Sequence, residues 1–282
     1  MAERTLDAGL AGFEFEPQQI SWRAQDVMLY ALGVGSKPEH ELDFLYEGRG
    51  PKVLPTYAVI PGMRAMGNIA KVVELNIARL LHGEQGIEIH RPLPPQAELT
   101  MRSHISEVWD KGTAAVIGVR ADFGDDDGPV FSTHSTLFYL GGGGFGGEPG
   151  PSTRDVNRPP DRPADLELRC MTREEQGALY RLSGDRVALH IDPDFARKAG
   201  YEKPFMHGLC TFGFVGRAVL QGLCEWDPER FVSIAGRFSE RVEFGDEIQT
   251  QIWHTGPGEV VLQAVTQDGK VALSHGRAVF RA

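Results

Sequence analysis

The chain has 282 residues, of which 41% are hydrophobic and 24% charged, and its net charge at pH 7 is -10. This composition is typical of a soluble globular protein, and the length suits two ordinary domains or one large one. The negative charge disfavours nucleic acid as a partner. No stretch approaches the ~20 apolar residues that a membrane span needs, so no membrane association is expected.

The cysteines and the N-terminal segment indicate a reducing compartment. Cys170, Cys210 and Cys224 show no CxxC spacing, and their odd number leaves one thiol unpaired. This pattern argues against a disulfide framework and against a zinc site. Residues 1–17 lack the basic start and the apolar run of a secretory signal. We therefore expect a cytoplasmic protein that holds no metal.

Residues 1–140 predict a first unit of helix and antiparallel sheet. After an arm over residues 1–20, Ser21 is expected to cap a helix in WRAQDVMLYALGVG. Residues 36–62 are rich in Pro and Gly and should be irregular, while residues 63–90 should start as a weak helix and run towards a strand. From Ala97, three β-rich runs separated by DKG and DDDG predict an antiparallel meander.

Residues 141–165, GGGGFGGEPGPSTRDVNRPPDRPAD, predict a linker. Their glycines and prolines prevent regular structure, and their charges keep the segment in water. Gly142, Gly144 and Gly147 match GxGxxG after a probable strand, but the EPGPSTRD that follows cannot open the helix that a dinucleotide-binding fingerprint requires. We therefore reject a dinucleotide-binding domain.

Residues 166–282 repeat the plan of the first unit. A short strand in ADLELRCMT is followed by Thr172 and Glu175, which are expected to form a capping box for a helix. The run GLCTFGFVGRAVLQGL carries small and apolar residues all round and predicts a helix buried on most sides. Three β-rich runs close the chain, as they close the first unit.

The two halves also align by motif. YRLSGD at Tyr180 follows YALGVG at Tyr30 by 150 positions, and internal duplication is the economical explanation. In this alignment Gly35 falls where Asp185 stands, and His40 falls opposite His190. One half is therefore expected to have kept chemistry that the other has lost.

The strap, residues 180–208, gathers the candidate chemical groups. Gly184 and Asp185 favour loop conformations and should end a helix, whereas Asp192 followed by Pro is a helix start. Asp185 and His190, held close between these points, would form a general acid/base pair. Spacing alone equally allows a turn-forming Asp185 and a surface His190. A metal on His190 and Asp192 would lack a third ligand.

The strap sequence YRLSGDRVALHIDPDFA resembles the signature of the MaoC-like, R-specific (type-2) enoyl-CoA hydratases, roughly Y-x-L-S-G-D-x-N-P-L-H-x-D-P-x-x-A. YALGVG, YEG, LPTYAVI, LLHGEQ, WDKG, GGFGG and HGLCTFG resemble the two-domain members, so the resemblance covers nearly the whole chain. It implies an α+β double hotdog, with a degenerate half that makes room for the acyl chain and a catalytic second half. It also implies hydration of trans-2-enoyl-CoA to (3R)-3-hydroxyacyl-CoA, with no metal or redox cofactor beyond the coenzyme A of the acyl-CoA substrate.

By motif position, the resemblance makes Asp185 and His190 the catalytic pair and Gly208 the donor to the oxyanion. Asp185 is assigned as the base and His190 as the water holder and acid, with the reverse assignment open. Glu47 in YEG matches an acidic position linked to activity in the family, and His207 borders the oxyanion site. Both could instead be structural, Glu47 as a solvated loop residue and His207 as a packing residue.

Val187 and Ala188 depart from the family, which has Asn-Pro at these positions. Val187, a candidate substrate-binding residue, offers no side-chain hydrogen bond to a catalytic water, and Ala188 leaves the loop more freedom. The departure keeps open a non-catalytic or weakly active acyl-CoA binding protein. A hotdog thioesterase is disfavoured because the strap is nearly complete. The double hotdog could be a monomer or pair as a homodimer.

Overall fold

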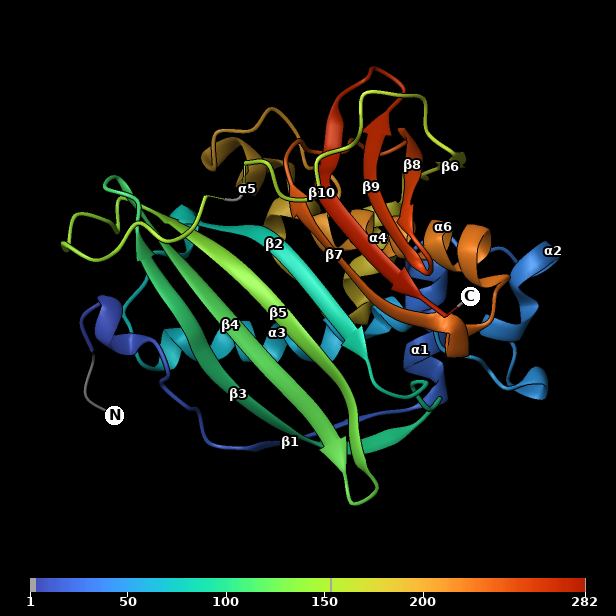
Figure 1. Cartoon of the computed structure of the whole chain (residues 1–282), viewed down its shortest axis with the longest axis horizontal. Helices are drawn as coiled ribbons and strands as arrows, with labels where there is room; N and C mark the ends of the chain where they lie inside the picture. Colours follow the sequence, from blue (N-terminus) through green and yellow to red (C-terminus); the bar gives the residue numbers. More distant parts are fainter. Residues whose placement is uncertain (1–3, 153, 282) are drawn as a thin grey trace.

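The computed structural model describes residues 4–152 and 154–281, with Ala78 described by its backbone alone. In these residues one antiparallel sheet curves around two helical segments (Figure 1). Its strands are β1 (Gln18–Trp22), β2 (Leu80–Ile89), β3 (Ala97–Asp110), β4 (Ala114–Asp125), β5 (Gly128–Leu140), β6 (Leu166–Met171), β7 (Phe231–Phe238), β8 (Glu247–Gly256), β9 (Glu259–Thr266) and β10 (Val271–Phe280). The α-helices are α1 (Ala24–Gly33), α2 (Pro38–Glu41), α3 (Val59–Gly67), α4 (Gln176–Tyr180), α5 (Pro193–Lys198) and α6 (Gly208–Cys224).

The strand order reads the same from both edges of the sheet. It is β1-β3-β4-β5-β2-β7-β10-β9-β8-β6, so β1 corresponds to β6, β2 to β7, β3 to β8, β4 to β9 and β5 to β10. Each half also places three α-helices between its first and second strands. The duplication predicted from the sequence is therefore confirmed as two copies of one β-α-α-α-β-β-β-β unit.

The halves join at the centre of the sheet, where β2 pairs antiparallel with β7. Glu84 lies opposite Arg237 in this register, and the Arg237 Nη2 donates to Glu84 Oε1 over 2.6 Å. Opposite charges directly across a strand pair stabilise that pair. One continuous sheet thus holds both halves, and no separate interface is needed between two sheets.

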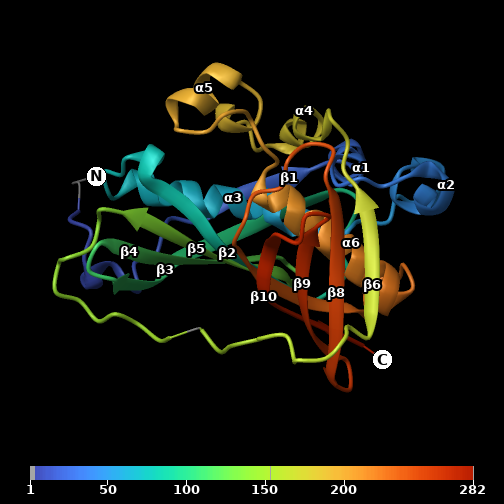
Figure 2. The same ribbon diagram turned by 90° about the horizontal axis from the view of Figure 1, so that it is seen from above.

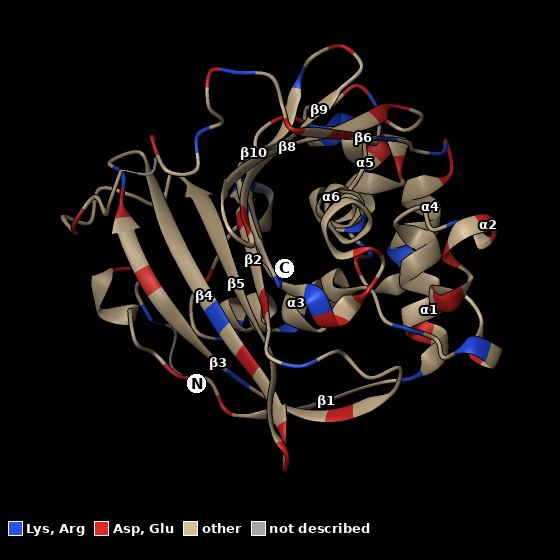
Figure 3. Ribbon diagram, turned by 45° about the vertical axis from the view of Figure 1, so that its right-hand side comes forward, with Lys and Arg blue, Asp and Glu red and all other residues tan. Residues whose placement is uncertain are grey.

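The long helix α6 lies inside the curve of the second half, as Figure 3 shows in a view along its axis. Arg217 is its one charged residue, and nearly all its other side chains are buried, which confirms the predicted buried helix. The first half has a less regular counterpart, in which turns over Pro55–Ala58 lead into α3 and Asn68–Lys71 follow it. This helical region begins earlier than residue 63, because Pro55 at a first helical position is compatible with a helix start.

Two predicted helix caps are wrong. Ser21 lies in β1, paired with Glu98 of β3, and α1 is instead capped by Arg23. Thr172 forms no capping box with Glu175, because its hydroxyl donates to the Asp246 carbonyl oxygen over 2.9 Å. In both places the residue pairs with a partner that is distant in the sequence, and it does not cap the helix that the local pattern predicted.

The segment between β5 and β6 is irregular, as predicted, and Figure 2 shows it running along the side of the sheet away from the helices. Its glycine-rich start folds around Asp110, whose carboxylate accepts from the backbone N–H groups of Gly112, Gly144 and Gly146, each over 2.8 Å. These bonds lower the pKa of Asp110. The GxGxxG match therefore reflects a loop that wraps a carboxylate, not a dinucleotide site.

Candidate active site

The strap leaves α4 where the sequence predicted. After α4, one tighter turn over Arg181–Ser183 ends at Gly184, whose φ of +144° favours glycine. The strap then runs to α5, where the Asp192 carboxylate accepts from the N–H groups of Asp194 and Phe195. Asp185 and His190 therefore lie between two defined helix ends. Among the described residues, no group of three or more His, Cys, Asp or Glu side chains that could hold a metal ion is found.

Asp185 and His190 are partly buried and influence each other. Burial raises the pKa of Asp185, and His190 offsets part of this effect. Burial likewise lowers the pKa of His190. Among the described contacts no hydrogen bond or ion pair joins the two side chains, while Asp185 Oδ1 accepts from the Val187 N–H over 3.4 Å. The two side chains therefore interact through their charges and not through a direct hydrogen bond.

The orientation of His190 is fixed by the backbone. Its Nδ1 lies 2.9 Å from the Phe205 carbonyl oxygen. A carbonyl oxygen can only accept, so Nδ1 carries the proton and Nε2 holds the lone pair. Because burial lowers the pKa of His190, the ring is held neutral, and its Nε2 can accept a hydrogen bond or a proton.

His207 contacts both members of the pair, through the ring of His190 and the backbone of Asp185. It is 0% exposed, and its ring packs against that of His190 with centroids 4.0 Å apart and planes tilted by 32°. Its Nε2 donates to the backbone oxygen of Asp185 over 3.1 Å. Burial lowers the pKa of His207 to about 3, so the ring is neutral at physiological pH.

Gly208 follows His207 and is the first residue of α6. The first N–H groups of a helix have no acceptor within the helix, and the helix dipole is positive there. A Cβ atom at this position would lie 3.2 Å from the Phe238 ring, which in turn packs edge-on against His82. Glycine therefore leaves room beside the N–H group for another oxygen to approach.

The first half also reaches this site. The Ile60 side chain of α3 lies 3.6 Å from the position of a Cβ on Gly184, and His82 comes from β2. Neither residue was assigned to the site from sequence, because Ile60 lies 120 positions and His82 lies 98 positions before the start of the strap. Only the fold of the central strands and of α3 brings them to it.

Two of the other sequence candidates lie at the edge of this arrangement or outside it. Val187 is 48% exposed, so its side chain faces solvent beside the pair. Glu47 is exposed on the turn Glu47–Arg49, and its side chain makes no hydrogen bond or ion pair with any described residue. The structure thus gathers Asp185, His190, His207 and Gly208, and it does not bring Glu47 into contact with them.

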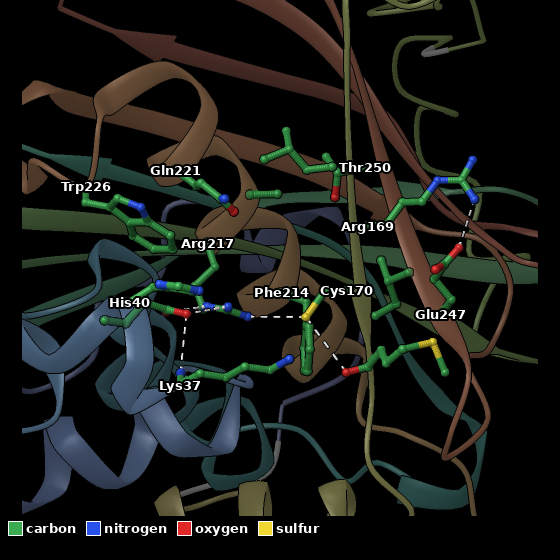
Figure 4. Close-up of a pocket in the computed structure, with 15 residues that line it drawn as sticks. Lys37, His40, Arg169, Cys170, Phe214, Arg217, Gln221, Trp226, Glu247 and Thr250 are labelled. Carbon is green, nitrogen blue, oxygen red and sulfur yellow. Dashed lines mark hydrogen bonds and ion pairs between the residues drawn. The ribbon is translucent and has the colours of Figure 1, made fainter.

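The corresponding place in the first half is filled. Gly35, the counterpart of Asp185, has φ +84°, and a Cβ there would lie 2.7 Å from the Phe214 ring. Arg217 closes the space from α6, with its Nε and Nη2 each donating to the Glu41 carboxylate over 2.8 Å. A cavity of about 530 Å³ remains beside this ion pair, with His40 at its wall (Figure 4). The first half therefore has no acid at the position of Asp185 and no room for a side chain there, while a cavity is open beside the nearby ion pair.

Two tandem units of the same element order, each with a helical segment inside the curve of one continuous sheet, define a double hotdog protein. The MFE-2 hydratase 2 N-terminal domain matches residues 21–141, and the MaoC like domain matches residues 155–275. A crystal structure of a MaoC-like dehydratase from Phytophthora capsici is 32% identical, with a TM-score of 0.85 over 98% of this chain and 96% of that one.

Curated relatives agree with these matches. The 3-hydroxyacyl-thioester dehydratase Y of Mycobacterium tuberculosis is 41% identical over 98% of each chain. The probable enoyl-CoA hydratase 2 of Dictyostelium discoideum is 36% identical over 95% of this chain and 94% of its own. The peroxisomal multifunctional enzyme type 2 of Mus musculus is 39% identical over 95% of this chain, which spans only 37% of the mouse enzyme. The chain belongs to the MaoC-like hydratase 2 family of double hotdog proteins.

Proposed function

We propose that this chain catalyses the reversible hydration of trans-2-enoyl-CoA to (3R)-3-hydroxyacyl-CoA. The observation that carries the proposal is the meeting of three groups in one place, namely the Asp185 carboxylate, the Nε2 lone pair of His190 and the free N–H at the start of α6. The names of relatives as enoyl-CoA hydratase and 3-hydroxyacyl-thioester dehydratase support the same reaction in its two directions.

In this proposal Asp185 and His190 hold one water molecule between them. Asp185 is the base, since burial has raised its pKa and so strengthened its affinity for a proton. His190 Nε2 accepts the second O–H of the water and orients it. The hydroxyl oxygen bonds to C3 of the substrate, and the pair returns the proton to C2 on the same face. The reaction thereby adds the hydroxyl group and the remaining hydrogen of one water molecule to C3 and C2 of the substrate.

Gly208 has the electrostatic role. Attack at C3 moves negative charge onto the thioester oxygen, and a fixed N–H donor at a helix start stabilises that charge. The glycine lets the oxygen approach, because any side chain here would meet Phe238. No metal or redox cofactor is proposed, since addition of water changes no oxidation state overall and the pair can supply the acid and the base.

The departure at Val187 does not remove the proposed activity. Val187 contributes its backbone N–H to Asp185, and its half-exposed side chain borders the site as a candidate contact for substrate. We propose that residues 166–282 carry the chemistry and residues 1–140 accommodate the acyl chain, with Ile60 and His82 on the shared wall. Glu47 stays a candidate substrate contact only if substrate draws its loop towards the strap.

A panel of trans-2-enoyl-CoA thioesters, from crotonyl-CoA to long-chain substrates, tests the proposal. The expected result is loss of the enoyl absorbance together with formation of the (3R) alcohol by chiral analysis. Release of free CoA thiol would identify a thioesterase instead. Tight binding without turnover, with turnover restored by Val187→Asn and Ala188→Pro together, would identify a binding protein. Either outcome contradicts the hydratase.

The compartment and the assembly are also proposals. No helix among the described residues could span a membrane. The described cysteines Cys170, Cys210 and Cys224 are free thiols, which supports a reducing compartment such as the cytoplasm. The two halves pair within one chain at β2 and β7, which supports a monomer, although edge strands β1 and β6 leave a homodimer as the alternative. Mass measurement in solution decides between the two.

A further inference from the structure

Three buried polar atoms belong to the strap that carries the proposed acid/base pair, and one of them is on the His207 ring that packs against His190. The Tyr180 hydroxyl, the Ser183 hydroxyl and His207 Nδ1 are all buried, and none has a hydrogen-bond partner in the part of the chain that the structure describes. Tyr180 and His207 are each 0% exposed. Leaving such groups unpaired costs free energy, so buried polar atoms are normally satisfied by protein or by ordered water.

The tautomer of His207 determines what its unpaired atom needs. Nε2 lies 3.1 Å from the Asp185 carbonyl oxygen, which can only accept, so Nε2 carries the proton. Burial keeps the ring neutral. Nδ1 therefore presents a lone pair into a space closed to solvent, and it requires a donor.

Tyr180 is the donor that the fold supplies. Its ring lies beside His207, with centroids 5.0 Å apart. Burial raises the pKa of Tyr180, so the phenol keeps its proton and can donate. Because no direct bond is present between the two atoms, one buried water can accept from the Tyr180 O–H and donate to His207 Nδ1.

We propose that Tyr180 is a positioning residue for the hydration reaction, acting through one buried water on His207 Nδ1. This contact locks His207 in the Nε2–H tautomer, and that tautomer holds the backbone of Asp185 and supports the ring of His190. The inference rests on the proposed function for its kinetic consequence. Its tautomer consequence is independent of any activity.

The duplication provides a matched control. Tyr30 stands opposite Tyr180 in the two halves, is equally buried, and packs against it with centroids 6.1 Å apart. Its hydroxyl, however, lies 2.8 Å from the position of a Cβ on Gly213, in the middle of α6 and away from His207. Tyr30→Phe thus removes a buried hydroxyl from the same aromatic pair without changing any residue of the strap.

The first measurement compares Tyr180→Phe with Tyr30→Phe in crotonyl-CoA hydration. Tyr180→Phe is expected to lower kcat by about two- to tenfold, the range that one hydrogen bond supports. KM should be unchanged because Tyr180 does not touch the substrate. Tyr30→Phe should match the parent. Equal kcat values for the two variants would overturn the proposal.

The second measurement is the 15N spectrum of the histidine side chains in the parent and in Tyr180→Phe. In the parent, His207 should give the signature of one protonated Nε2 and one hydrogen-bonded Nδ1, and in the variant Nδ1 should shift to the value of a free lone pair. An unchanged His207 signal would overturn the proposal. This readout needs no turnover, so an inactive parent would reject the hydratase function and still leave the role of Tyr180 decided.

Discussion

At the scale of single residues, two histidines are kept neutral by the fold. Burial lowers the pKa of His82 to about 4 and that of His207 to about 3. In the unfolded chain both rings would take a proton near pH 6.5, so the unfolded state binds more protons below that pH. Their contribution to stability is therefore present above pH 6.5 and is lost as the pH falls towards 4 and 3.

This linkage predicts a measurable slope. Below pH 6.5, each of these histidines should lower the free energy of unfolding by about 1.4 kcal/mol per pH unit. His82→Asn should remove the contribution of one histidine, about 1.4 kcal/mol per pH unit, from this slope. The measurement is urea unfolding at a series of pH values. Identical slopes in the parent and in His82→Asn would show that His82 is protonated in the folded protein.

At the scale of elements, the start of α6 and the ring of Phe238 define the space for the thioester oxygen. A Cβ added at Gly208 would lie 3.2 Å from the ring, so the ring or the helix start must shift. We expect Gly208→Ala to lower kcat by roughly 10- to 100-fold, less than the ~10² to 10³ of a fully lost oxyanion donor.

A matched glycine is available in α3 of the first half. Gly67 has nothing within 4 Å of its Cβ position, so Gly67→Ala should leave kcat unchanged. The measurement is steady-state hydration by both variants. If Gly208→Ala retained the parent kcat, the approach of the thioester oxygen would not depend on the absence of a side chain at this position.

The elements also show where local sequence was sufficient. The buried helix α6, the three-strand runs of each half and the Asp192 cap of α5 follow from patterns within a few residues, and all were predicted. The caps at Ser21 and Thr172 were not, because Ser21 pairs with a strand 77 positions away and Thr172 bonds Asp246, which lies 74 positions away just before β8. Partners so distant in the sequence cannot be recognised from a local sequence pattern.

The same distinction applies to the candidate site. Asp185, His190, His207 and Gly208 lie on one short strap, so their meeting could be predicted from their order in the chain. Ile60, His82 and Phe238 come from α3, β2 and β7, and only the fold brings them there. Tyr180 was visible in the motif, but its orphaned hydroxyl beside His207 could not be read from the sequence.

At the scale of the whole molecule, a buried ion pair ties the halves together. Glu41 of α2 and Arg217 of α6 are 4% and 9% exposed in their side chains, and Arg217 also donates from Nη1 to the Val34 carbonyl oxygen over 2.9 Å. Removing one partner of such a pair leaves a buried charge, whereas replacing both with apolar residues of similar size is often neutral.

We therefore expect Glu41→Ala to lower the free energy of unfolding by about 3 to 5 kcal/mol. The double variant Glu41→Leu with Arg217→Met should recover most of that loss. Lys52→Ala, which breaks an exposed pair with Asp43, is the control and should cost no more than about 1 kcal/mol. The comparison is made by urea unfolding. A loss from Glu41→Ala as small as that from Lys52→Ala would mean that the Arg217 charge is not buried.

The asymmetry between the halves is the central feature of the molecule. The fold repeats its elements from edge to edge, yet the second strap presents Asp185 and His190, while the first presents Gly35 packed against Phe214 and an exposed His40. We therefore assign a single candidate active site to the molecule, on the strap of the second half. The first half contributes walls to that site.

The most direct measurement is hydration of trans-2-enoyl-CoA by Asp185→Asn, His190→Ala and the first-half control His40→Ala, beside the parent. The account predicts that each strap variant lowers kcat by at least about 10²-fold, the scale of general acid/base catalysis, with unchanged unfolding midpoints. His40→Ala should match the parent. Parent-like rates in both Asp185→Asn and His190→Ala would contradict the assignment of the reaction to this pair.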